Sequence, residues 1–365
     1  MALITEFFQM IKDMMAGGYP DYVIKNRIGD EIPVFVYHRV DRKVFEDQLR
    51  YLRDNGYQTL NIQQLEDCLV QGENLSSKDI VLTFDDGLED LYTVAYPLLR
   101  SFGFQGVAFI APYWVGEEGL VNWEQVKEMH QSGVIDFQAH SYTHSRIYVS
   151  PKIDDFFHPG FRCHHRWQFP LVDNGSGRIS KGLPPFGMPI YQFASSLSGA
   201  KKYLSNREIE AFCIDYVENR GGKDFFHRFF WRRQLKKAVR SFLREKSSRY
   251  EYETREEQRD RVRKEMELSK KVIEKELQGK RVISFAYPYF ERSETIDRLL
   301  KECGYRFIFG GLERGSVFNS NNFEFHFFRR INGDFIQRLP GQGKVSLCRL
   351  LFLKLSRRLN NVSMF

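Results

Sequence analysis

Short apolar runs alternate with segments of helical spacing along much of the chain. Six runs rich in β-branched and aromatic residues predict strands, over 33–37, 80–84, 106–111, 134–139, 282–287 and 305–309. Apolar positions three and four residues apart predict helices, each ending at or just before a glycine, over 45–56, 91–102, 123–132 and 294–303. This alternation predicts βα units around a parallel sheet, and hence an α/β fold.

Residues 150–279 interrupt the alternation. Gly, Pro and aromatic residues dominate the first part, to about residue 191, and predict a long loop. The stretch 232–249 has eight basic residues and one acid, and 251–276 mixes both charges with few apolar positions, as a long solvated helix does. We therefore interpret 150–279 as an insertion that caps the rim of the α/β domain.

The remaining boundaries follow from this insertion. We expect an N-terminal helical segment over 1–31, the first part of the α/β domain over 32–149, and its second part over 280–340. A basic amphipathic helix is expected over 341–365, because residues 344–359 place five basic residues around an apolar face. Such a helix can lie on an anionic bilayer. Docking on the α/β domain is the commoner role of an amphipathic helix.

Charge and cysteine content suggest partners and location. The net charge of +7 suggests an anionic partner such as a membrane surface, a phosphorylated sugar or a nucleic acid. A nucleic acid is not expected, because no binding module is recognisable and acids are interleaved after residue 249. The five scattered cysteines fit a reducing compartment. With an acid at the amino terminus and no bilayer-length apolar run, we expect a cytoplasmic location, including the inner face of the membrane.

Two polar motifs follow apolar runs. Thr83-Phe84-Asp85-Asp86-Gly87 ends one run with adjacent carboxylates, and a later run leads to His140-Ser141-Tyr142-Thr143-His144. Two imidazoles and one carboxylate form the ligand set of an open catalytic metal site, which leaves the other aspartate free to act as a base. Taken alone, each motif could be a turn or a surface helix face. Both motifs in this order favour a metal site.

A third motif completes a resemblance to a known family. With Phe285-Ala286-Tyr287-Pro288-Tyr289-Phe290, the chain resembles the polysaccharide deacetylases of the NodB-like carbohydrate esterase family 4, and in particular the circularly permuted poly-N-acetylglucosamine deacetylase branch. The resemblance covers 32–147 and 281–333. It implies a distorted, incomplete (β/α) barrel that removes acetyl groups from sugars with the help of a divalent metal.

The resemblance also assigns roles to residues. Asp86, His140 and His144 would bind the metal, which we expect to be Zn²⁺, although Ni²⁺, Co²⁺ and Fe²⁺ also suit these ligands. Asp85 would be the catalytic base. His38 is the candidate general acid, because Val36-Tyr37-His38-Arg39-Val40 matches the permuted branch and a late Leu-x-His motif is absent.

The third motif departs from the commoner family pattern. Tyr289 would donate its backbone N–H to the oxyanion, but Ala286 occupies a position where most members have arginine. Arg330 could replace that arginine and orient the base. A surface salt bridge is an equally good explanation for Arg330.

The function expected is therefore metal-dependent hydrolysis of the acetamide of an N-acetylated sugar, in a glycan or in a lipid- or nucleotide-linked precursor. The alternative is a catalytically silent barrel that binds glycan or membrane within a polysaccharide synthesis complex. A second cluster, His158, Cys163, His164 and His165, fits a substrate cleft better than a second metal. The sequence leaves open the sugar, its carrier, the choice of N- or O-acetyl group, the metal, the role of the insertion and the oligomeric state.

Overall fold

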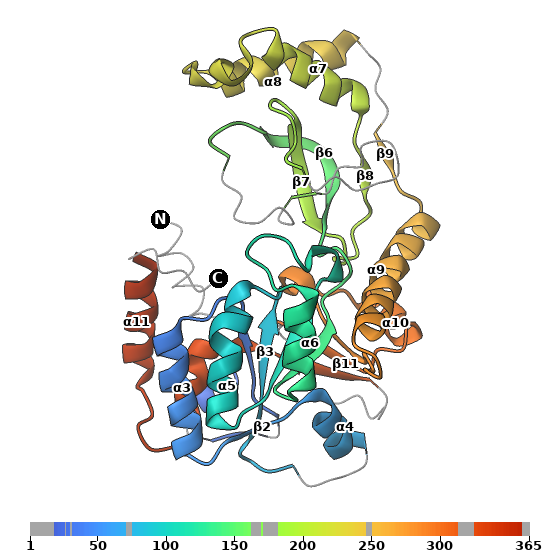
Figure 1. The fold of residues 1–365 in the computed structure, drawn as a ribbon. Coiled ribbons are helices and arrows are strands. Elements are labelled where there is room, and N and C mark those ends of the chain that lie inside the picture. Colours follow the sequence, from blue (N-terminus) through green and yellow to red (C-terminus); the bar gives the residue numbers. More distant parts are fainter. Residues whose placement is uncertain are drawn as a thin grey trace. The chain divides into compact units, whose positions relative to one another are not determined.

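A computed structural model describes residues 18–25, 27–29, 31–70, 75–161, 169–170, 182–245, 250–312 and 325–359 (Figure 1). Contacts divide the chain into two compact units. Unit 1 comprises Met1–Tyr142, Glu265–Glu291 and Arg298–Phe365, and unit 2 comprises Thr143–Lys264 and Arg292–Asp297. Of the predicted N-terminal helical segment, the described part contains α2 (Asp21–Ile24).

Parallel strands form the centre of unit 1. They pair in the order β12-β11-β10-β5-β4-β3-β1-β13, and β2 pairs with β3. Their bounds are β1 (Val34–Tyr37), β2 (Gln58–Thr59), β3 (Asp79–Asp85), β4 (Gly106–Ile110), β5 (Ile135–Ala139), β10 (Ser284–Ala286), β11 (Phe307–Gly310), β12 (His326–Arg329) and β13 (Ile331–Asn332). Most of these strands are buried along their whole length, as parallel strands covered on both faces are.

The sheet closes almost completely into a barrel. Its two end strands, β12 and β13, are separated in sequence only by Arg330, so one extended segment pairs first with β11 and then with β1. Phe109 of β4 and Phe309 of β11 are not neighbours in the sheet, yet their ring centroids are 5.0 Å apart. Apolar side chains therefore meet inside the barrel. The predicted α/β fold with a distorted (β/α) barrel is confirmed.

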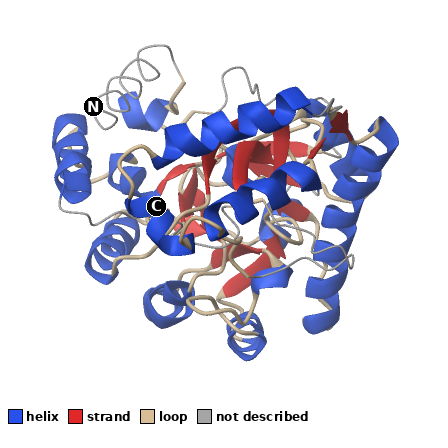
Figure 2. Ribbon diagram, turned by 90° about the horizontal axis from the view of Figure 1, so that it is seen from above, coloured by secondary structure: helices blue, strands red, loops and turns tan. Residues whose placement is uncertain are grey.

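Helices and short turns connect these strands, and Figure 2 shows helices around the barrel strands. Their bounds are α3 (Arg42–Asp54), α4 (Ile62–Val70), η1 (Leu91–Ala95), α5 (Tyr96–Phe102), η2 (Pro112–Trp114), α6 (Trp123–Gln131), η5 (Pro288–Phe290), α10 (Glu294–Glu302), η6 (Gly333–Arg338) and α11 (Leu347–Leu359). Side chains fix the start of two of them, because Asp41 accepts from the backbone N–H of Val44 and Asn122 accepts from that of Gln125. None of the described helices is both long and apolar enough to span a membrane.

Unit 2 has a core of its own. Its elements are β6 (Arg146–Phe156), β7 (Pro189–Ser195), β8 (Tyr203–Leu204), α7 (Arg207–Glu218), η4 (Gly222–His227), α8 (Trp231–Glu245), β9 (Glu251–Tyr252) and the first part of α9 (Arg255–Glu276). Buried side chains of α7, η4 and α8 pack together with Phe156 of β6. The predicted long helix over 251–276 is confirmed by α9.

The long loop predicted to about residue 191 is wrong at both ends. β6 and β7 pair there as antiparallel strands, with irregular register between Tyr148 and Asp155. The irregular register bends the pair, so neither strand shows a clean alternation of apolar and polar residues. The glycines and prolines that indicated a loop lie mostly between the two strands.

Candidate metal centre and catalytic site

The polar residues of the motifs follow the carboxyl ends of the barrel strands, where (β/α) barrels place their active sites. The strands bring residues from distant parts of the chain to one end of the barrel. The residues brought together in this way are His38 after β1, Asp85 and Asp86 at the end of β3, His140 after β5, Tyr289 after β10 and Arg330 between β12 and β13. His144 follows His140 by four residues along the chain.

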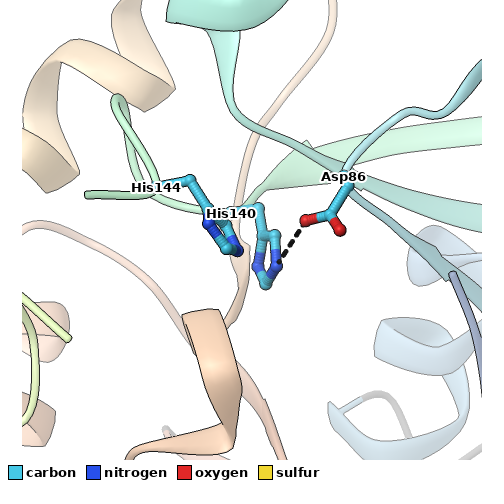
Figure 3. A group of neighbouring side chains, drawn as sticks. All are labelled: Asp86, His140 and His144. Atoms are coloured by element: carbon cyan, nitrogen blue, oxygen red, sulfur yellow. Dashed lines mark ion pairs between the residues drawn. The ribbon is translucent and has the colours of Figure 1, made fainter. Parts of the chain in front are cut away.

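Asp86, His140 and His144 form the candidate metal-binding group. One ligand atom from each side chain lies within 4.8 Å of the other two. Figure 3 shows the two imidazole rings next to each other, with the Asp86 carboxylate directed at His140. Nε2 of His140 is 3.5 Å from Oδ1 of Asp86. Both histidines are buried, so their rings are held in a restricted space.

The hydrogen bond on the far side of the His140 ring fixes its tautomer. Nδ1 of His140 lies 2.8 Å from the backbone oxygen of Ala286. A carbonyl oxygen can only accept, so Nδ1 carries the proton. Burial lowers the pKa of His140, against the opposing effect of Asp85 and Asp86, and so favours the neutral ring.

This tautomer supplies a test of whether a metal fits. A neutral His140 protonated on Nδ1 directs its Nε2 lone pair toward the carboxylates of Asp85 and Asp86, which are 3.8 and 3.5 Å away. Lone pairs that face each other repel, and a cation between them removes the repulsion. A backbone carbonyl behind the ring is also one of the partners to which metal-bound histidines donate their other N–H. The donor set therefore fits a divalent cation.

Asp85 is buried beside this group and is held by Arg330. Nη1 of Arg330 donates to Oδ1 of Asp85 at 2.7 Å. The other oxygen, Oδ2, is 3.8 Å from Nε2 of His140 and 3.9 Å from Nε2 of His38. Burial raises the pKa of the Asp85 carboxyl, but the Arg330 guanidinium leads the opposing effects through its charge and its hydrogen bond, and this pKa lies below its ordinary value. The site thus favours the ionised carboxylate that a base requires.

Arg330 is the largest of the fully buried side chains among the described residues, with 2% of its surface exposed. Its guanidinium lies 5.6 Å from the ring of Phe109 and 5.1 Å from that of Phe290. Its backbone N–H donates to the carbonyl of Gly310 at 3.1 Å. The alternative of a surface salt bridge is therefore wrong for Arg330. Its role in orienting Asp85 during catalysis stays a prediction.

Backbone strain is concentrated at the motifs. Among the described residues, all non-glycine residues with positive φ lie in them: Asp86 (69°), Ser141 (60°), His144 (50°), Tyr289 (59°) and Phe290 (58°). Non-glycine residues in this conformation cost free energy and tend to cluster at functional sites. Two of the five are proposed metal ligands, so the strain lies where side chains must be aimed.

His38 and Tyr289 border the same site. The side chain of His38 is 24% exposed, and its ring meets that of Phe290 edge to face at 5.9 Å. A hydrogen bond anchors the turn that carries His38, because the backbone N–H of Val40 donates to the carboxylate of Asp90 at 3.0 Å. Tyr289 is half-buried in η5. The roles of His38 as general acid and Tyr289 as oxyanion donor stay predictions.

Sequence reasoning missed the residues that support the site. In the sequence, Ala286 stands out only because it lacks an arginine side chain, whereas its carbonyl oxygen accepts a hydrogen bond from His140. Phe109 flanks Arg330, and Asp90 anchors the His38 turn. A backbone carbonyl leaves no mark in a sequence, and a phenylalanine in an apolar run looks like any core residue. Of these supporting residues, only Asp90 carries a charge that could mark it in the sequence as a candidate.

The second histidine cluster does not form a metal site among the described residues. Nε2 of His158 lies 3.0 Å from Arg232 and 3.8 Å from Asp155, and its ring packs 5.0 Å from that of Trp231. These contacts are all within unit 2. Cys163, His164 and His165 lie outside the described residues.

The sequence of this chain is similar to known proteins over the segment that carries the candidate metal ligands. Residues 72–155 match the family model for polysaccharide deacetylase. The match includes Asp85, Asp86, His140 and His144, and the predicted resemblance is confirmed.

Two curated relatives extend the comparison. Over 132 residues, the chain is 36% identical to the putative polysaccharide deacetylase YxkH of Bacillus subtilis, covering 34% of this chain and 47% of that protein. It is 28% identical over 132 residues to the poly-beta-1,6-N-acetyl-D-glucosamine N-deacetylase of Escherichia coli, covering 32% of this chain and 20% of that protein. The chain thus matches less than half the length of either relative.

The fold has a counterpart among solved structures. The de-N-acetylase from Aggregatibacter actinomycetemcomitans superimposes with a TM-score of 0.54 at 17% identity, covering 88% of this chain and 99% of that chain. At this identity, the likeness supports the fold alone.

Proposed function

We propose that this protein is a metal-dependent hydrolase that removes the acetyl group from an N-acetylated sugar in a glycan or glycan precursor. The observation that carries the proposal is the ionised, arginine-held Asp85 next to the group Asp86, His140 and His144. The name of the Escherichia coli relative supports acetylated poly-N-acetylglucosamine as the substrate class.

The reaction adds water to the acetyl carbonyl and breaks the carbon–nitrogen bond, which releases acetate and a free amine on the sugar. A divalent cation bound by Asp86, His140 and His144 would supply a water of lowered pKa and an electrophile for the carbonyl. Zn²⁺ is the metal we propose, since the ligands are two imidazoles and one carboxylate.

Different residues carry out the two proton transfers of the reaction. Arg330 binds Oδ1 of Asp85, so Oδ2 is the oxygen available to accept the proton of the water. His38 lies 3.9 Å from this oxygen and is partly exposed, which suits a donor to the departing sugar nitrogen. The backbone N–H of Tyr289, held in a strained turn, would stabilise the developing oxyanion.

Acetate release tests the proposal directly. The full chain is incubated with acetylated poly-β-1,6-glucosamine oligomers, nucleotide-linked N-acetylated sugars and lipid-linked glycans, with added metal or with a chelator. We expect metal-dependent release from at least one substrate and a loss of about 10²–10⁴-fold in Asp85→Asn. Asp54→Asn is the matched control, because its carboxylate is 63% exposed on α3, and it should retain full activity.

Two outcomes would contradict the proposal. Activity that survives both the chelator and Asp85→Asn would exclude this site as the catalytic centre. Metal binding without turnover on any acetylated sugar would favour a silent binding barrel. Thermal unfolding of each variant shows whether an inactive variant is folded.

The carrier and the location of the substrate belong to the same proposal. We propose a peripheral membrane contact through 344–359, supported by the exposed Phe352 and Leu353 of α11. Leu350 and Leu351 of this helix are buried, and Lys354 pairs with Asp334 at 3.3 Å, so part of α11 is docked on unit 1. The cytoplasmic location stays a prediction, which fractionation of the natural host would test.

A further inference from the structure

Helix α8 of unit 2 has two opposite faces. Trp231, Leu235 and Val239 are buried in the core that α8 shares with α7. The opposite face carries Arg233, Lys237, Arg240 and Arg244, which are all exposed. Their spacing of four, three and four residues places them in one row along the helix. At 1.5 Å per residue, this basic row is about 17 Å long.

The four residues of the basic row are not neutralised within the described part of the chain. No carboxylate of the described residues lies within ion-pair distance of Arg233, Lys237, Arg240 or Arg244. The two remaining basic residues of the helix are engaged. Arg232 forms a bidentate ion pair with Asp155 at 2.9 and 3.1 Å, and Lys236 donates to the backbone oxygen of Asp154 at 3.1 Å. Arg232 and Lys236 thus fasten α8 to β6. All six basic residues of the helix line one surface recess.

The basic row works against the stability of its own helix. Like charges four residues apart repel on a helix surface. Arginine in the first turn also opposes the helix dipole, and α8 has Arg232 and Arg233 there with no acid. Neighbouring α7 has the favourable arrangement of charges, with the acids Glu208 and Glu210 in its first turn. A row that breaks these local rules without a compensating contact indicates an external partner.

Two phenylalanines at the start of α8 indicate the kind of partner. Phe229 and Phe230 are 90% and 59% exposed, and their rings contact each other edge to face at 4.8 Å. The carbonyl of Phe230 accepts the first hydrogen bond of the helix, from the backbone N–H of Gln234 at 3.0 Å. Phe230 precedes Arg233 by three residues, so the aromatic pair lies next to the start of the basic row. Large apolar side chains this exposed usually mark a surface that becomes covered.

We propose that Phe229, Phe230 and the basic row of α8 form a docking surface for a lipid bilayer with anionic headgroups. An outward-facing helix with aromatic side chains beside a row of Lys and Arg has the pattern of an interfacial membrane contact. The rings enter the boundary of the acyl chains, and the row pairs with headgroup phosphates. A soluble polyanion satisfies the charges alone, whereas an anionic bilayer satisfies the charges and covers both rings.

Vesicle co-sedimentation of the full chain tests the proposal. Vesicles of phosphatidylcholine alone are compared with vesicles that also contain phosphatidylglycerol. Each Lys or Arg near an anionic surface strengthens binding by about fivefold. A variant with Arg233→Gln, Lys237→Gln, Arg240→Gln and Arg244→Gln should therefore bind the anionic vesicles several hundredfold more weakly.

A second quadruple variant controls for charge. Arg255→Gln, Lys264→Gln, Lys271→Gln and Lys275→Gln remove the same charge from exposed positions of α9, where acids are interleaved. This variant should bind within a few-fold of the unmodified chain. The pair Phe229→Ser and Phe230→Ser should weaken binding by about tenfold or more, and the loss should persist at high salt.

Three results would overturn the proposal. The two quadruple variants could lose binding equally, which would make the effect one of net charge. The phenylalanine variant could bind as tightly as the unmodified chain, which would remove the apolar contact. Single- and double-stranded oligonucleotides, measured in parallel, could bind more tightly than the vesicles, which would identify a nucleic-acid surface instead.

Discussion

The buried pair of Asp85 and Arg330 allows a quantitative prediction about stability. The two groups are 2.7 Å apart, and their side chains are 1% and 0% exposed. Replacing Arg330 by Met removes the positive charge and leaves the carboxylate buried without its partner. Breaking such a pair costs about 3–5 kcal/mol of the free energy of unfolding. In a domain of 150–250 residues, this lowers Tm by about 6–20 °C.

The assay is thermal and urea unfolding followed by circular dichroism. Arg329→Met is the matched control, because the neighbouring Arg329 pairs with Glu31 at 2.7 Å with both side chains partly exposed. That pair should contribute only about 1 kcal/mol. The double variant Asp85→Asn, Arg330→Met should recover about 2 kcal/mol or more relative to the sum of the single changes. Equal losses at Arg329 and Arg330, or additive single changes, would refute the claim that Arg330 holds Asp85.

Three further predictions test other parts of the molecule. Burial raises the pKa of Glu253, but the two hydrogen bonds from Arg261 outweigh it, so the folded-state pKa lies below its ordinary value. The ion pair of Glu253 with Arg261 should thus stabilise unit 2 fully above the ordinary pKa of glutamate, and this stabilisation should be lost as pH falls through the folded-state pKa of Glu253. Urea unfolding midpoints should show this pH dependence for the unmodified chain and not for Glu253→Gln. Burial raises the pKa of the Cys213 thiol to about 12, so a thiol reagent in mild alkali should modify the exposed Cys348 in the native protein and Cys213 only after unfolding. A Cβ at Gly333 would overlap the ring of the β1 tyrosine, so Gly333→Ala should cost about 1–3 kcal/mol in urea unfolding; an unchanged midpoint would contradict this packing.

Much of the barrel could be predicted from local sequence. Runs such as 80–84 and 106–111 are apolar enough to be strands buried on both faces, and β3 and β4 lie there. Helix ends were also readable, since Gly103 takes the left-handed conformation that closes α5. The motif residues needed no long-range information, because they directly follow predicted strands.

The remainder depends on contacts between distant segments. The partnership of Arg330 with Asp85 exists because β12 and β13 close the barrel against β1, and nothing near residue 330 encodes that closure. The carbonyl of Ala286 reaches His140 for the same reason, through the pairing of β10 with β5. In unit 2, the sequence of α8 shows its charge but does not predict a helix, because Trp231, Leu235 and Val239 are sparse among basic residues.

The number of metal ions bound per chain shows whether Asp86, His140 and His144 form a metal site. We expect that the purified chain, dialysed against Zn²⁺ and measured by elemental analysis, retains one metal ion per chain. His140→Ala and His144→Ala should lose it, because each removes one of three ligands. Asp85→Asn should retain the metal while losing acetate release, because Asp85 is assigned to the proton and Asp86 to the ion. Full metal retention by both histidine variants would contradict the assignment of His140 and His144 as metal ligands.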